Sequence, residues 1–186
     1  MVRDIQADFT MDNTLGCLPL TLNFDGSPSQ DEVSYQWDFG DSTGTFSGGP
    51  TFSHVFISRG IFDVAMIVTD VNGCSDTIKK QIHAFKPNAY FYADTLSNCV
   101  PFLVDFADTS KSDTIIVDWN WSFGDGGIDS VQNPSYGYST PLGKTVTLIV
   151  TDSLGCKDTL VNSNYIIPLQ PFPNWTVSDN TICFGS

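Results

Sequence analysis

The sequence predicts an all-β protein built from two β-sandwich domains in tandem. An internal repeat is the first reason, because Tyr35–Asp41 (YQWDFGD) returns as Trp119–Asp125 (WNWSFGD). A fixed period of this length indicates one structural unit used at least twice. Composition is the second reason: 20 of the 21 acidic residues are Asp, and Lys plus Arg total only 8. Asp favours turns, whereas the charged residues that favour helices are scarce.

The strands of the first domain follow from alternating apolar and polar residues between turn residues. Ser34–Phe39 places its aromatic residues on one face and its polar residues on the other. Asn72–Gly73 is typical of a tight hairpin turn between the last two strands. The expected strands are Gln6–Thr10, Leu18–Phe24, Ser34–Phe39, Phe52–Phe56, Phe62–Asp70 and Cys74–His83.

The second domain repeats this order. Its expected strands are Tyr90–Ala93, Phe102–Phe106, Ile115–Phe123, Tyr136–Tyr138, Thr145–Asp152 and Cys156–Tyr165. Short strands at this spacing, with turn signals between them, are typical of a β-sandwich. We therefore expect domain 1 at residues 1–86 and domain 2 at 87–170. Residues 171–186 are expected to form a linker and the first strand of a truncated third repeat, because Trp175–Val177 and Cys183 resemble the opening of another unit.

The charge balance excludes two classes of partner. A net charge of −13 disfavours nucleic acid, whose phosphates require Lys and Arg, and it disfavours an anionic membrane surface. The longest apolar stretches have the length of strands, so no membrane insertion is expected. The expected partners are neighbouring repeats of the same chain, and a surface polysaccharide or protein ligand.

The cysteines form a repeated pattern. Cys17 and Cys74 are 57 residues apart, and so are Cys99 and Cys156. The identical spacing predicts one disulfide bond within each domain, and an oxidising, extracellular or cell-surface location. A metal site is the alternative, but it would need more ligands than two His residues supply. Cys183 is expected to be a free thiol.

One geometric difficulty stands against this pairing. In a simple sandwich topology, Cys17 at the start of the second strand and Cys74 at the last hairpin would lie toward opposite ends. A disulfide bond needs Cα atoms within about 7 Å of each other. Either the first strand is irregular enough to bring Cys17 round, or the pairing is wrong.

Several motifs resemble the polycystic kidney disease (PKD) repeat. Trp37–Asp41 (WDFGD), His54–Phe56 (HVF), and Gly60 with Val64–Asp70 are similar to the family signature WDFGDG, HxY and GxYxV with VxD. Trp121–Gly126 (WSFGDG) and Tyr136–Tyr138 (YGY) carry the resemblance in the second repeat. The resemblance covers nearly the whole chain and implies an immunoglobulin-like sandwich. Its motif and core positions are Trp37, Asp38, Phe39, Gly40, Asp41, Trp121, Phe123, Gly124 and Asp125.

The sequence departs from that signature at a few positions. Ser122 stands where the family has Asp, and Ser42 stands where Gly is usual. Cys17–Leu22 (CLPLTL) and Asn72–Thr77 (NGCSDT) resemble the multi-repeat surface proteins of Bacteroidota. That resemblance implies export by the type IX system and a role in adhesion or gliding.

Candidate catalytic groups are few. Asp38 and Asp41 are two carboxylates near one turn, which a glycosidase would need as acid and nucleophile. Ser122 replaces the first of them in the second repeat, so the pair is better explained by side-chain to backbone hydrogen bonds that set the turn. His54 aligns with Tyr136, which indicates a packing role. No enzymatic activity is expected.

Calcium is a better hypothesis than catalysis, because Asp-rich loops supply the oxygen ligands that calcium prefers. The candidate ligands are Asp25 and Asp31 before the Trp37 strand, and Asp108 and Asp113 at the matching place in the second repeat. The alternative is that these are solvated carboxylates of turns. No EF-hand spacing is present, and no other cofactor is expected.

The sequence therefore predicts a non-catalytic extracellular repeat module. The first hypothesis is a structural stalk or adhesion segment of a large surface or secreted protein. The second is an accessory module of a secreted hydrolase that binds polysaccharide or protein through exposed aromatic residues. An exposed row of Tyr or Trp would favour the second, and the candidates are Tyr90, Tyr92 and Trp119.

Overall fold

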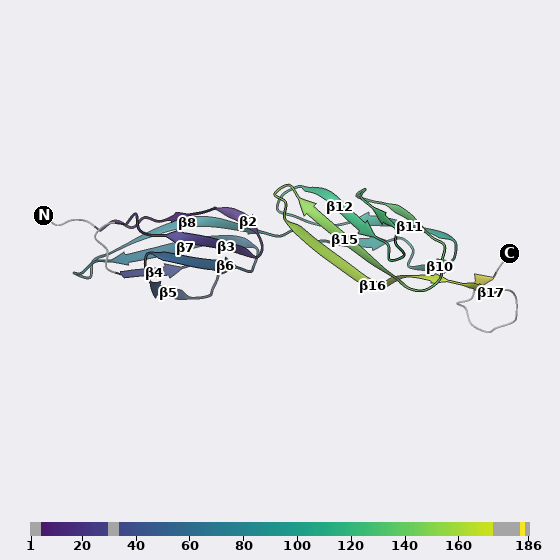
Figure 1. The fold of residues 1–186 in the computed structure, drawn as a ribbon, viewed down its shortest axis with the longest axis horizontal. Coiled ribbons are helices and arrows are strands. Elements are labelled where there is room, and N and C mark those ends of the chain that lie inside the picture. Colours follow the sequence, from purple (N-terminus) through teal and green to yellow (C-terminus); the bar gives the residue numbers. More distant parts are fainter. Residues whose placement is uncertain (1–4, 30–33, 173–182, 185–186) are drawn as a thin grey trace. The chain divides into compact units, whose positions relative to one another are not determined.

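The protein is all-β. The computed structural model describes residues 5–29, 34–172 and 183–184, and every regular element in that part of the chain is a β-strand (Figure 1). The chain divides into two compact units, Met1–Lys86 and Pro87–Ser186. Each unit has a hydrophobic core of its own. The predicted fold class, two tandem β-sandwiches, is confirmed.

Unit 1 is a sandwich of a three-stranded and a five-stranded sheet. The orders are β1-β3-β6 and β2-β8-β7-β4-β5. All neighbours are antiparallel except β2 and β8, which are parallel. The strands are β1 (Thr10–Met11), β2 (Leu15–Cys17), β3 (Leu20–Asp25), β4 (Ser34–Asp38), β5 (Thr45–Gly48), β6 (Thr51–Phe56), β7 (Gly60–Thr69) and β8 (Ser75–Phe85).

Unit 2 repeats this topology. Its sheets have the orders β14-β11-β9 and β10-β16-β15-β12-β13, and β10 and β16 are again the parallel pair. The strands are β9 (Phe91–Ala93), β10 (Ser97–Cys99), β11 (Phe102–Asp108), β12 (Ile116–Ser122), β13 (Ile128–Asp129), β14 (Ser135–Tyr138), β15 (Lys144–Asp152) and β16 (Lys157–Leu169).

A short parallel pair follows unit 2. It consists of β17 (Pro171–Phe172) and β18 (Cys183–Phe184). The rest of the predicted third-repeat fragment, including Trp175–Val177, lies outside the described residues.

The motif tryptophans lie at the centre of the two cores. Trp37 is fully buried, with its ring centroid 5.3 Å from that of Phe9 and 5.8 Å from that of Phe24. Such edge and tilted contacts are the arrangements that aromatic rings prefer. Trp121 is fully buried in unit 2, where Phe91 takes the place that Phe9 has in unit 1. The repeat in the sequence is therefore a repeat of the core.

The short strands that flank each sandwich were not expected. The sequence predicts no strand at Leu15–Cys17, but this segment forms β2 and pairs in parallel with the end of β8. Three residues are too few to show an alternating pattern. The position of this strand has consequences for the cysteines.

Candidate functional site

The signature turn of unit 1 is held by its own side chains. The backbone N–H of Gly40 donates to Asp38 Oδ1 at 2.9 Å, which is the local turn contact expected of an Asp at this place. Gly40 has a φ of +71°. A Cβ there would lie only 2.7 Å from the backbone oxygen of Asp63. The turn therefore requires glycine for its conformation and for the close approach of the neighbouring strand.

His54 covers the turn of unit 1 as a stacked ring. Its imidazole lies parallel to the ring of Phe39, with centroids 4.0 Å apart, and its Nε2 lies 2.7 Å from Asp41 Oδ2. The hydroxyl and backbone N–H of Thr43 also donate to Asp41. Burial raises the pKa of Asp41, but the hydrogen bonds from Thr43 and His54 outweigh it, so the net pKa lies below its usual value.

Unit 2 builds the same arrangement with a tyrosine. The ring of Tyr136 stacks on Phe123 with centroids 4.0 Å apart, and its hydroxyl donates to Asp125 Oδ1 at 2.8 Å. Burial, together with Asp125, raises the pKa of Tyr136. Because a neutral phenol replaces the imidazole without changing the stack, the shared role of the pair is to brace the turn. Acid–base chemistry is not what the two repeats have in common.

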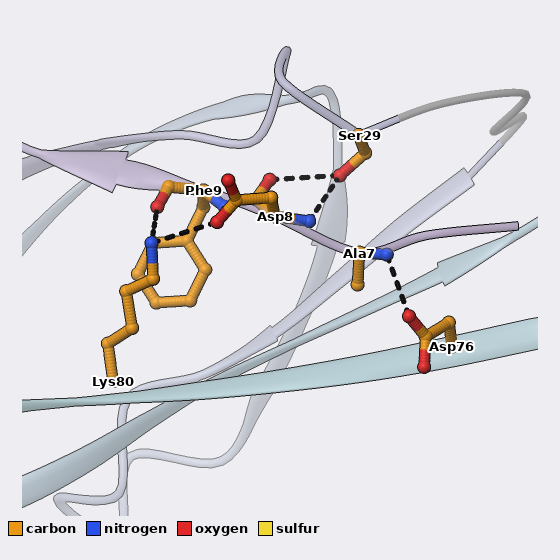
Figure 2. A network of polar contacts seen from close by, with 6 residues as sticks. All are labelled: Ala7, Asp8, Phe9, Ser29, Asp76 and Lys80. Atoms are coloured by element: carbon orange, nitrogen blue, oxygen red, sulfur yellow. Dashed lines mark hydrogen bonds and ion pairs between the residues drawn. The ribbon is translucent and has the colours of Figure 1, made fainter.

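A second polar network fastens the segment that precedes β1 (Figure 2). The backbone N–H of Ala7 donates to Asp76 Oδ2 at 2.8 Å. Ser29 makes a reciprocal pair: its Oγ accepts from the backbone N–H of Asp8 at 3.1 Å and donates to the backbone oxygen of Asp8 at 2.9 Å. Extended backbone outside a sheet thus finds its partners in side chains.

Unit 2 fastens its first segment through the same contacts. The backbone N–H of Ala89 donates to Asp158 Oδ2 at 2.8 Å, and that of Tyr90 donates to Ser110 Oγ at 3.0 Å. These contacts between residues about 70 and 20 positions apart could not be read from one repeat. Comparing the two repeats would have indicated them, because Asp76 and Asp158 occupy equivalent positions.

Lys80 adds a contact that is peculiar to unit 1. Its Nζ lies 2.9 Å from Asp8 Oδ1, donates to the backbone oxygen of Phe9, and lies 4.9 Å from the centroid of the Phe9 ring (Figure 2). The Lys80 hydrogen bond and charge lower the pKa of Asp8. The equivalent position in unit 2 is Asn162.

The cysteine prediction is wrong for Cys74, which is a free, exposed thiol. Cys17, Cys99 and Cys156 are disulfide-bonded. The side chain of Cys183, predicted to be free, lies outside the described residues.

The short parallel strands explain why the predicted pairing fails. Cys17 is the Cα partner of Phe85, at the far end of β8 from Cys74. Eleven residues of extended chain separate these two ends, which is about 36 Å. A disulfide bond requires about 7 Å or less between Cα atoms, so Cys17 and Cys74 cannot be joined.

The geometry of unit 2 excludes a disulfide bond between Cys99 and Cys156 in the same way. Cys99 is the Cα partner of Leu169, whereas Cys156 lies immediately before the first residue of β16. Thirteen residues of extended strand amount to about 43 Å. The first of the two alternatives, in which an irregular strand brings the partners together, is therefore excluded in both repeats.

Two of the calcium candidates, Asp25 and Asp108, accept local hydrogen bonds from the backbone N–H two residues later, as turn residues do. Asp25 accepts from the backbone N–H of Ser27 at 2.8 Å, and hydrogen bonds from Ser27 lower its pKa. Asp108 Oδ2 accepts from Trp119 Nε1 at 2.8 Å. Asp31 lies outside the described residues.

Calcium binding stays a prediction. Asp113 is described, yet in that part of the chain no group of three or more His, Cys, Asp or Glu side chains is placed to hold a metal ion. An unchanged melting temperature in calcium and in chelator would refute the hypothesis.

The aromatic candidates separate into two kinds. Tyr90 and Tyr92 are 59% and 55% exposed, whereas Phe91 between them is buried in the core. Tyr92 lies on β9 and Tyr90 directly precedes that strand. Because alternate residues of an extended chain point to opposite sides and Phe91 points into the core, the two tyrosines lie on the outer side of the sheet β14-β11-β9. Trp119 is half-buried and its indole N–H is bonded to Asp108. Only the tyrosines form the exposed row that the sequence suggested.

A hollow of unit 1 lies over the sheet β1-β3-β6. It measures about 520 Å³ and is open to solvent. Asp12, on its rim, is paired with Asn23 through Oδ1 to the backbone N–H at 3.1 Å and Oδ2 to Nδ2 at 2.9 Å. Its other lining residues are Thr10, Met11, Phe24, Asp25, Thr51, Phe52 and Ser53. The lining holds two carboxylates, Asp12 and Asp25, and each already accepts hydrogen bonds from a neighbouring residue, Asp12 from Asn23 and Asp25 from Ser27.

Comparison with known proteins settles the family. The PKD domain family matches residues 6–85 and again residues 84–167. The chain belongs to the PKD domain family. The PKD assignment suggested by the signature turns is therefore correct for both units, and the chain consists of non-catalytic modules of this kind.

Two curated relatives carry similar segments. The chain is 31% identical over 134 residues to the pre-pro-metalloprotease PrtV of Vibrio cholerae, an alignment that covers 69% of this chain and 14% of that protein. It is 40% identical over 65 residues to the collagenase ColA of Clostridium perfringens, covering 33% of this chain and 6% of that protein. The PKD chain thus spans a small part of each relative's length.

Solved structures of single PKD domains are also similar. The PKD1 domain of Vibrio cholerae PrtV is 29% identical, with a TM-score of 0.38, and covers 44% of this chain and 98% of its own. The PKD1 domain of Vibrio anguillarum Epp is 29% identical, with a TM-score of 0.39, and covers 45% and 96%. Each corresponds in length to one unit of the present chain. Within the described residues, no helix is both long and apolar enough to cross a membrane.

Proposed function

We propose that this chain is a non-catalytic accessory segment of a secreted hydrolase, and that unit 2 holds a polymeric substrate through Tyr90 and Tyr92. The relatives with similar segments include a metalloprotease and a collagenase. This favours the second of the two hypotheses drawn from the sequence over a purely structural stalk.

The observation that carries the proposal is the pair of exposed tyrosines. Tyr92 belongs to β9 and Tyr90 lies immediately before that strand, so two residues of extended chain place their Cα atoms about 7 Å from each other. The equivalent positions of unit 1 are Asp8 and Thr10, so the pair is not part of the shared core design. An exposed aromatic face with a polar hydroxyl suits the stacking of sugar rings or of apolar side chains.

The charge of the chain narrows the substrate class. A net charge of −13 repels polyanions such as acidic polysaccharides. A neutral polysaccharide such as chitin or cellulose, or an uncharged or basic protein fibre such as collagen, is compatible with it. These are the substrates to compare.

Sedimentation with insoluble polymer tests the proposal. The full chain is mixed separately with chitin, cellulose and collagen fibrils, and the bound fraction is measured against the double variant Tyr90→Ala/Tyr92→Ala. Val161→Ala is the control, because Val161 is 54% exposed but belongs to β16 in the other sheet of the same unit. Binding to one polymer that the double variant loses and the control keeps supports the proposal; equal binding by all three proteins, or none to any polymer, overturns it.

We also propose an extracytoplasmic location, because disulfide bonds form and persist in oxidising compartments. Cys17, Cys99 and Cys156 are disulfide-bonded. The stalk hypothesis remains the second candidate, and the separate core of each repeat supports it. Units that bury their own cores can be added in series without destabilising one another. The Bacteroidota-like segments Cys17–Leu22 and Asn72–Thr77, with their implied type IX export, belong to that candidate.

A further inference from the structure

Cys74 and Cys156, here called the turn cysteines, occupy the same turn in the two repeats but differ in chemical state. Each donates its backbone N–H to the carboxylate that begins the turn, Cys74 to Asp70 at 2.8 Å and Cys156 to Asp152 at 2.9 Å. Cys156 is disulfide-bonded and 1% exposed. Cys74 is free and exposed. The backbone of the turn is therefore alike at the two cysteines, but only Cys156 has a disulfide partner.

Cys17 and Cys99, here called the strand cysteines, lie at the opposite end of each sandwich. Each is disulfide-bonded and sits beside the last residue of the last long strand, Cys17 opposite Phe85 and Cys99 opposite Leu169. The distance of about 36 Å or more along that strand prevents a strand cysteine from reaching the turn cysteine of its own sandwich. The strand cysteine and the turn cysteine of one sandwich therefore do not form a disulfide bond with each other.

The two kinds of cysteine mark the two ends through which the chain passes. A turn cysteine lies two residues before the Asp that fixes the incoming segment, as Asp76 fixes Ala7. A strand cysteine lies beside the residue at which the last long strand ends. In a repeat placed before unit 1, the chain would therefore leave the sandwich beside the strand cysteine of that repeat. It would then continue directly to Ala7, near Cys74.

We propose that Cys74 is the attachment point for a preceding PKD repeat, whose strand cysteine forms a disulfide bond with it. In this arrangement, the disulfide bonds staple consecutive repeats to one another. An array linked by such bonds resists separation of its repeats under mechanical load. The exposed thiol of Cys74 thereby has a mechanical role that a single sandwich does not need.

The bond forms by thiol–disulfide exchange with an oxidised donor, either a dithiol carrier in its disulfide form or a small-molecule disulfide. The Cys74 thiolate attacks one donor sulfur and displaces the other as a thiolate. The thiolate of the partner's strand cysteine then attacks Cys74 Sγ and releases the second donor thiolate. Two protein thiols are oxidised by two electrons, and one donor disulfide is reduced to two thiols.

A longer chain that carries an additional repeat, here called the extended chain, supplies a strand cysteine as the partner for Cys74. Residues 1–88 of a second copy are placed directly before Ala7 of this chain, so that Phe85 of the added copy precedes Ala7 by four residues. Phe85 precedes Ala89 by the same four residues in the native chain. The added copy carries Cys74→Ser, so that one Cys74 remains, and a control extension also carries Cys17→Ser in the added copy.

The measurement is alkylation of Cys74, followed by non-reducing peptide mapping by mass spectrometry. We expect Cys74 of the 186-residue chain to be alkylated readily, and its alkylation rate to fall by at least about tenfold in the extended chain because a disulfide has no thiolate to react. The peptide containing Cys74 should then be linked to one containing Cys17. The control extension should restore alkylation.

Three results would overturn the proposal. One is alkylation of Cys74 at the same rate in the extended chain and in its control. Another is protection in both, since protection without a partner cysteine means burial. The third is a dimer of the native chain joined Cys74 to Cys74, because the partner would then be a turn cysteine.

Discussion

Two glycines of the unit 2 turn, Gly124 and Gly126, permit a direct separation of backbone strain from steric overlap. Both have left-handed backbones, with φ of +84° and +99°. A Cβ on Gly124 would lie 2.5 Å from the backbone oxygen and 2.8 Å from the backbone nitrogen of Thr145. A Cβ on Gly126 would meet nothing within 4 Å. Alanine at the two positions therefore differs in overlap alone.

The magnitudes follow from these two terms. The left-handed conformation costs an alanine about 1–2 kcal/mol relative to glycine, and this is the whole expected loss for Gly126→Ala. In Gly124→Ala the close atoms belong to the backbone of β15, which cannot rotate away as a side chain would. Overpacking adds about 1–3 kcal/mol, for a total of about 2–5 kcal/mol.

Thermal unfolding of the full chain, followed by calorimetry, measures both variants. Each kcal/mol corresponds to about 4–8 °C in Tm for a domain of this size. Hydrogen exchange in β7 and β15 assigns each transition to its unit, and unit 1 serves as the internal control. Equal losses of unit 2 stability in the two variants would refute the steric argument, as would a Gly124→Ala variant that unfolds like the native chain.

Three further predictions concern unit 1. Ser42→Gly should stabilise this unit by roughly 1 kcal/mol, since Ser42 is exposed and has a φ of +67°, and a higher Tm for unit 1 alone checks it. The folded-state pKa of Asp41 is lowered, so its stabilisation is present above the unfolded pKa near 4 and is lost as pH falls through the folded value. Asp41→Asn should therefore flatten the loss of unit 1 stability below about pH 4 in a pH series of melts. Lys80→Met should speed hydrogen exchange in the segment around Asp8, whereas the exposed neighbour Lys79→Met should not; equal exchange in both would remove Lys80 from the anchoring role.

The sequence predicted the long strands because their side chains carry the pattern that makes them strands. Ser34–Asp38 alternates between exposed and buried residues, as the spacing of its aromatic residues indicated. Leu15–Cys17 shows no such alternation, since a three-residue strand is held by its pairing with β8 and not by its own propensity. The disulfide prediction failed for this reason: equal spacing along the chain says which cysteines are equivalent, and not which of them are neighbours.

The role of His54 and Tyr136 at the signature turns was predicted only in part, for a related reason. Alignment of the repeats placed His54 and Tyr136 at one position, which pointed to packing. Their carboxylate partners, Asp41 and Asp125, lie 13 and 11 residues earlier, in turns that only the folded sandwich brings beside β6 and β14. Contacts between the two sheets depend on how the sheets pack face to face, and the sequence of a single strand does not determine that packing.

The two repeats together separate what the fold requires from what this protein adds. His54 and Tyr136 differ chemically, yet both stack on a Phe ring and bond to an aspartate, so the fold requires this geometry and not one particular side chain. Outside the core the repeats diverge freely, and the exposed Tyr90 stands where unit 1 has Asp8. A binding function that belonged to every PKD unit would be expected in both outer faces. Among the described residues, exposed tyrosines occur on the outer side of unit 2 and not of unit 1, so the proposed binding predicts that a ligand binds unit 2.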